Sequence, residues 1–202
     1  MSRDMDIRRL PVEAVEIREA DDGTVSLFGY AAVFGSLSEP IAGMFRERIV
    51  AGAFKRTLVE GGDVFALWQH DSSMPLARKS KGTLRMSEDT RGLSVEIDIP
   101  DTTYGRDAAE AVRSGLVDKM SFGFSVPAGG ARMLDERSED GYPIRELMDI
   151  ELYEVSPVTF PAYPDTSLSA RSIEAINDLK EAERVRKLSL MQKRLDLHKH
   201  SM

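Results

Sequence analysis

Only three histidines occur in the chain, and one of them lies in a setting suited to proton transfer. His198 and His200 stand within the last five residues, where chain ends commonly fray. His70 follows the apolar run 64–69 and precedes a polar Asp-Ser-Ser stretch, which predicts the end of a strand and the start of a loop. The scaffold can hold a general base at such an edge while a substrate still reaches it. A surface histidine on a loop, without a catalytic role, is the alternative interpretation.

A serine inside a strand-like run is the second candidate for chemistry. In residues 119–125 bulky apolar residues alternate with others, so that Ser121, Gly123 and Ser125 share the face opposite the apolar side chains. Ser121 is thereby placed to present a hydroxyl nucleophile, although a polar residue on a solvated strand face would give the same pattern. The segment is not the Gly-x-Ser-x-Gly elbow of the α/β-hydrolases, because Lys119 stands where the first glycine would be.

Carboxylates gather in a third run, residues 148–162. By alternation Asp149 and Glu151 share one face, while Glu154 falls among the apolar residues of the other. A carboxylate in an apolar set is unusual and predicts a buried pair or hydrogen bond for Glu154. The alternative interpretations are a solvated acidic face for Asp149 and Glu151 and, for Glu154, a salt bridge to an arginine such as Arg145 or Arg132.

Composition limits the kind of protein that these residues can serve. The 202 residues are 42% hydrophobic and 30% charged, which predicts about one domain with a true core and some appendages. A net charge of −7 disfavours binding to nucleic acid by broad phosphate neutralisation. The absence of cysteine excludes disulfides, thiolate metal sites and cysteine nucleophiles, and no second histidine lies at ligand spacing from His70, so we expect neither metal nor cofactor. No signal peptide or membrane span is recognisable, which predicts a soluble, intracellular protein.

The elements that must position the candidates are mainly strands. Before residue 171, helical spacing occurs at 51–60 and 104–114 only, so we expect a mainly β or α+β fold, closer to a barrel than to a doubly wound parallel sheet. The strand-like runs are rich in β-branched and aromatic residues or alternate apolar with polar ones; they are 24–34, 64–69, 83–86, 93–99, 119–126 and 144–159.

The C-terminal tail differs from the rest of the chain. Residues 172–202 carry a net charge of +2 against −9 for residues 1–171, and their apolar residues recur at spacings near three and four. This pattern predicts an amphipathic helix. We therefore divide the chain into an N-terminal segment with a first strand (1–22), one domain (23–170) and a helical tail (171–202).

Seven short segments follow one another in a distinctive order along residues 29–170. They are Gly29-Tyr30-Ala31-Ala32-Val33-Phe34, Phe45-Arg46-Glu47, Gly52-Ala53-Phe54, Leu67-Trp68-Gln69-His70-Asp71, Gly92-Leu93, Met120-Ser121-Phe122-Gly123-Phe124 and Glu154-Val155-Ser156-Pro157-Val158-Thr159-Phe160-Pro161-Ala162. Each segment is weakly specific alone, but in this order they closely resemble the prohead (capsid maturation) proteases of tailed phages of the HK97 type.

The resemblance implies an assemblin-like fold, a β-barrel surrounded by a few helices, and a catalytic serine and histidine. Carried over by position, Ser121 is the nucleophile and His70 the base. The herpesvirus assemblins use a second histidine as the third member, which this body lacks. Alignment with their strand favours Asp149 in that role, with Glu154 as the rival. Backbone N–H groups near residues 156–159 would be the oxyanion donors, although Pro157 has none to give.

The resemblance also implies substrates and partners. We expect a serine endopeptidase that cleaves the scaffolding segment of the major capsid protein, or a scaffold protein, and itself. It would act as a homo-oligomer inside the assembling prohead in the bacterial cytoplasm, without nucleic acid or membrane. The tail would target the protease to the prohead and be released by self-cleavage within residues 163–171. An inert scaffold or capsid-binding module of the same fold is the alternative.

Overall fold

The computed structural model describes residues 6–7, 15–20 and 23–159. Internal contacts divide the chain into two units, Met1–Thr166 and Ser167–Met202, and every described residue belongs to the first. The predicted tail helix and the predicted cleavage segment 163–171 therefore lie outside the described residues. So does the end of the predicted domain at residue 170.

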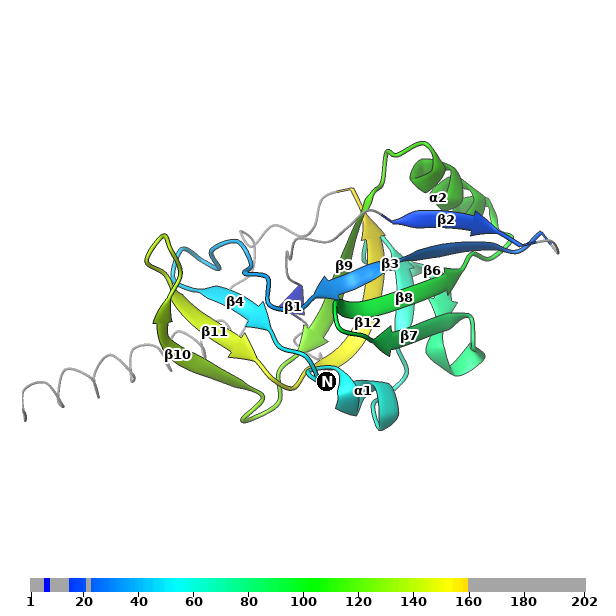
Figure 1. The fold of residues 1–202 in the computed structure, drawn as a ribbon. Coiled ribbons are helices and arrows are strands. Elements are labelled where there is room, and N and C mark those ends of the chain that lie inside the picture. The colour runs from blue at the N-terminus through cyan, green and yellow to red at the C-terminus, as the bar shows by residue number, and fades with distance from the viewer. Residues whose placement is uncertain (1–5, 8–14, 21–22, 160–202) are drawn as a thin grey trace, which may run out of the picture. The chain divides into compact units, whose positions relative to one another are not determined.

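The described chain is built mainly of strands, which confirms the predicted mainly β class (Figure 1). The strands are β1 (Asp6–Ile7), β2 (Glu16–Glu19), β3 (Val25–Val33), β4 (Arg46–Ile49), β5 (Phe65–Trp68), β6 (Asp71–Arg78), β7 (Leu84–Glu88), β8 (Gly92–Asp98), β9 (Lys119–Ser125), β10 (Ala131–Arg137), β11 (Pro143–Leu147) and β12 (Glu151–Val158). The helices are α1 (Lys55–Val59), the 3-10 helix η1 (Lys79–Lys81) and α2 (Thr103–Arg113).

The two helical predictions have different outcomes. α2 agrees with the expected 104–114 and begins where the Thr102 side chain accepts a hydrogen bond from the Gly105 amide. α1 is much shorter than the expected 51–60. Gly52 has a φ of 94°, which lies outside the helical region, so no α-helix can include that residue. None of the helices in the described ranges is long and apolar enough to cross a membrane.

The strands pair into three sheets in the described chain rather than into the single closed barrel that we expected. Their orders are β1-β9-β12-β5-β6, β2-β3-β8-β7 and β10-β11-β4. The first sheet ends at β6, which carries Pro75, and proline has no N–H with which to extend a ladder. The run 144–159, expected as one strand, is two strands in two different sheets, β11 and β12.

Strand β9 lies in the interior of the fold. Met120, Phe122 and Phe124 are at most 1% exposed, and Phe122 packs on the rings of Phe124 and Phe54 with centroid distances of 5.0 and 5.9 Å. The opposite face is covered too, because Ser121 is 1% exposed. The interpretation of Ser121 as part of a solvated strand face is therefore wrong.

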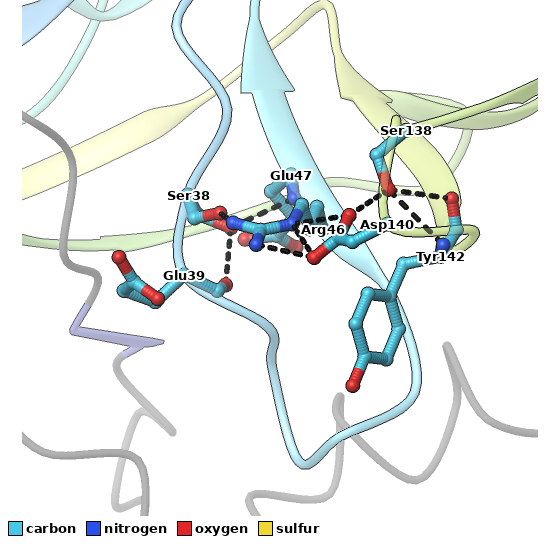
Figure 2. A network of polar contacts seen from close by, with 7 residues as sticks. All are labelled: Ser38, Glu39, Arg46, Glu47, Ser138, Asp140 and Tyr142. Atoms are coloured by element: carbon cyan, nitrogen blue, oxygen red, sulfur yellow. Dashed lines mark hydrogen bonds and ion pairs between the residues drawn. The ribbon is translucent and has the colours of Figure 1, made fainter.

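A polar network around Arg46 connects the sheet of β4, β10 and β11 to the loop that precedes β4 (Figure 2). The Arg46 guanidinium donates to both carboxylate oxygens of Asp140, at 2.5 to 3.2 Å, and to the carbonyl oxygen of Ser38. Ser138 Oγ donates to the same Asp140 carboxylate at 2.6 Å. These hydrogen bonds, that from Arg46 first, hold the pKa of Asp140 at about 2, below its ordinary value of 3.8.

This network makes a pH-dependent contribution to stability. Because the folded-state pKa of Asp140 is lowered, its contribution is complete above pH 3.8 and is lost as the pH falls toward about 2. Asp140→Asn should therefore unfold at lower urea concentration than the wild type at neutral pH, and the difference should shrink as the carboxyl protonates. Urea titrations across this pH range test the prediction. The control is Asp107→Asn, which removes the same charge on the exposed side of α2. An equal loss of stability in both variants would contradict the prediction.

Candidate active site

His70 lies in the tight turn between β5 and β6. Trp68 pairs with Asp71, so Gln69 and His70 form a two-residue hairpin loop. Their φ angles are 56° and 63°, the signs of a type I′ turn, although neither residue is glycine. A non-glycine residue in this region costs on the order of 1–3 kcal/mol and persists only where its surroundings hold it. The expected end of a strand before His70 is confirmed, but Asp71 begins another strand rather than a loop.

The His70 imidazole contacts a carboxylate and leaves its other nitrogen unpaired. Nδ1 lies 2.8 Å from Glu154 Oε1, and the His70 backbone N–H donates to Ser156 Oγ at 3.3 Å. Nε2 is buried and has no hydrogen-bond partner among the described residues. With Nδ1 donating to the carboxylate, the neutral ring carries its lone pair on Nε2, as a general base requires.

Glu154 lies within the middle strand of its sheet. It pairs with Gly123 of β9 on one side and Phe65 of β5 on the other, and it is 3% exposed. Its second oxygen, Oε2, accepts a hydrogen bond from Ser156 Oγ at 2.5 Å. The buried hydrogen bond predicted for this carboxylate is confirmed. The arginines that were its alternative partners, Arg145 and Arg132, bind Glu47 and Glu146 instead.

Ser121 is brought to the same place by strand register. It pairs across the ladder with Ser156, the residue whose side chain contacts both Glu154 and the His70 backbone. Ser121 Oγ is buried and, like His70 Nε2, has no hydrogen-bond partner among the described residues. Buried polar groups are nearly always paired, so unpaired ones need an explanation. A hydroxyl and an imidazole nitrogen that exchange a proton during a reaction would provide one.

Asp149, the acid favoured from the resemblance, contacts an arginine. Arg56 Nε of α1 donates to its two oxygens at 3.0 and 2.9 Å, and both side chains are more than a third exposed. The hydrogen bond to Asp149 raises the pKa of the guanidinium. Asp149 lies just before β12 begins, whereas Glu154 lies within it. Of the two carboxylates considered, Glu154 is the one that contacts His70.

A bulge explains why simple alternation misjudges this strand. Leu152 pairs with Phe124 but Glu154 pairs with Gly123, so three residues of β12 stand against two of β9 and Tyr153 is the extra one. A bulge changes which face the following side chains occupy. Counting alternate residues from Asp149 therefore does not give the side of the sheet on which Glu154 lies.

Two residues of the site were not singled out for their side chains by sequence reasoning. Ser156 follows Glu154 at the strand period of two, so its place on the same face was readable from the sequence. No pattern in the sequence pointed to the side chain of Gln69. Its side-chain oxygen accepts a hydrogen bond from the Thr159 backbone N–H at 3.1 Å. That N–H is one of the expected oxyanion donors, and it already has a partner.

A hydroxyl, an imidazole and a carboxylate are the groups that a serine protease uses for acyl transfer. Residues 12–179 match the family described as caudovirus prohead serine protease. The chain therefore belongs to that family.

A solved structure shares the fold. "Structure of the bacteriophage T4 capsid assembly protease, gp21" is similar to this chain with a TM-score of 0.52 and 12% sequence identity, over 78% of this chain and 98% of that one. At this identity the likeness concerns the fold alone. A comparison with curated proteins found no match.

Proposed function

We propose that the chain is a serine endopeptidase that cleaves the scaffolding segment of the major capsid protein, or a scaffold protein, during prohead maturation. The family match supports the class of enzyme. The observation that carries the proposal is the arrangement of Ser121, His70 and Glu154 around Ser156, which pairs with Ser121 across the ladder and contacts Glu154 and the His70 backbone. The two atoms that would exchange a proton have no hydrogen-bond partner among the described residues.

In this mechanism Ser121 Oγ attacks the scissile carbonyl carbon while His70 Nε2 takes its proton. The tetrahedral intermediate collapses as the C–N bond breaks, and the imidazolium returns the proton to the leaving amine. Water then repeats the sequence on the acyl-enzyme, with His70 again as base, and regenerates the Ser121 hydroxyl.

Glu154 is the third member in this proposal, in place of Asp149. Its Oε1 lies at hydrogen-bond distance from His70 Nδ1, so it would hold the tautomer with the lone pair on Nε2 and stabilise the imidazolium. Ser156 donates to the other carboxylate oxygen and keeps the acid oriented. Asp149, bound to Arg56, would instead connect the start of β12 to α1.

The enzyme would act as a homo-oligomer inside the assembling prohead in the host cytoplasm. Its basic tail would bind capsid or scaffold helices, and self-cleavage within residues 163–171 would release it. An inert assembly module of the same fold is the second candidate. It is disfavoured because such a module gains nothing from a buried hydroxyl and a buried imidazole nitrogen that have no partners.

Co-expression with the major capsid protein tests the proposed function. Wild-type chain should convert the capsid protein to a shorter product and should itself lose the tail, both visible by intact-mass measurement. Ser121→Ala should leave both proteins at full mass. Cleavage by Ser121→Ala would reject the serine mechanism, and full-length capsid protein with the wild type would favour the inert module.

A further inference from the structure

The turn that carries His70 contains no glycine, the residue that adopts positive φ most readily. Another turn of the described chain has two successive positive φ values, at Ala42 (49°) and Gly43 (66°), and it places glycine second. In the His70 turn both positions hold larger side chains, at 56° and 63°. Contacts outside the turn must therefore stabilise its geometry.

Those contacts come largely from Gln69. Its backbone N–H donates to the Pro157 carbonyl oxygen at 3.2 Å. Its side-chain amide binds one residue at two points: Nε2 donates to Thr159 Oγ1 at 2.9 Å, and Oε1 accepts from the Thr159 N–H at 3.1 Å. One amide thus supplies the donor and the acceptor together.

Gln69 is hydrogen-bonded to the end of the same strand that carries Glu154. Pro157 belongs to β12 and Thr159 directly follows it, while Glu154 and Ser156 lie in the same strand. A displacement of the turn relative to β12 would change the distance between His70 Nδ1 and Glu154 Oε1, now 2.8 Å. It would also move Nε2 relative to Ser121.

We propose that Gln69 is a positioning residue of the protease: its amide anchors the His70 turn to the end of β12 and so sets the imidazole against Glu154. The inference rests on the proposed function for its kinetic consequence but not for its geometry. Gln69 touches neither the substrate nor the reacting atoms in this account and acts through His70.

Gln69→Gly separates positioning from stability. Glycine adopts positive φ without strain, so the variant relaxes the turn while it loses the anchor. We expect kcat on a capsid-protein substrate to fall by about 10–100-fold with little change in KM, and the thermal midpoint to stay level or rise. Ala42→Gly relieves the same backbone conformation elsewhere and is the matched control, with unchanged kcat. Wild-type kcat in Gln69→Gly, or a kcat loss explained by unfolding, would overturn the proposal.

Two further measurements test the anchor, and the second of them does not depend on proteolysis. Thr159→Val removes the hydroxyl that accepts from Gln69, so adding it to Gln69→Gly should cause no further loss of kcat. The imidazole ¹⁵N shifts of His70 should indicate one neutral tautomer, with the proton on Nδ1, in the wild type and a mixture in Gln69→Gly. If the wild type cleaves nothing, the proposed function fails, and these shifts alone decide the positioning: identical shifts in both proteins would overturn it.

Discussion

Replacement of Ser121 or His70 by alanine is expected to lower kcat/KM for capsid-protein cleavage by about 10⁴-fold or more, because neither proton abstraction nor nucleophilic attack proceeds without the other. The double variant should be little slower than the slower single variant. Cleavage rates of the purified variants, with unfolding curves to show that each is folded, make the measurement. Additive losses in the double variant would contradict the view of one catalytic unit.

Ser125→Ala is the matched control. Ser125 lies in the same strand, four residues from Ser121, and is also buried, but its hydroxyl is hydrogen-bonded to that of Tyr153 at 2.7 Å. The control should keep its activity and lose about 1 kcal/mol of stability with that bond. Ser121→Ala should lose its activity and keep its stability. The Ser121 hydroxyl has no partner among the described residues, so its removal leaves no group unpaired. A Ser125→Ala variant as inactive as Ser121→Ala would mean that β9 tolerates no change, whatever the chemistry.

Glu154→Gln should reduce kcat/KM by about 10³- to 10⁴-fold while the protein remains folded. The amide keeps the shape of the side chain and can still accept from Ser156. It cannot balance the charge of an imidazolium, and it no longer favours the His70 tautomer with a free Nε2.

Asp149→Asn removes the same charge close by in the sequence and serves as its control. We expect nearly full activity and a loss of less than about 1 kcal/mol, because the Arg56 pair is more than a third exposed to solvent. Steady-state kinetics and urea denaturation of both variants make the test. The opposite result, an inactive Asp149→Asn and an active Glu154→Gln, would restore Asp149 as the acid.

Much of the secondary structure follows from local pattern. All six strand-like runs contain strands, and α2 lies where its apolar spacing predicts it, because period and β-branched content act over a few neighbouring residues. Strands β4, β6 and β10 were not predicted, and one strand was expected in residues 1–22, where β1 and β2 both lie. β4 reads Arg-Glu-Arg-Ile and is held in its sheet by pairing with β11, whose residues lie almost 100 positions away. The division into three sheets was likewise hidden, since it depends on such distant pairings.

The sequence alone determined which side chains were available for catalysis. With no cysteine, and with His198 and His200 at the chain end, it left one imidazole for the body and placed it at the end of a strand. It also placed Ser121 in a strand and identified Glu154 as a carboxylate in need of a partner. These are properties of composition and of short-range alternation.

Only the tertiary structure decided which of these side chains meet. Ser121 lies opposite Ser156 through the register of β9 and β12, and His70 reaches Glu154 because β5 pairs in parallel with the same strand. The choice between Asp149 and Glu154 depends on one extra residue in a bulge and on Arg56, which engages the first of them. Register and bulges are set by side-chain packing between strands distant in sequence, so no local pattern contains them.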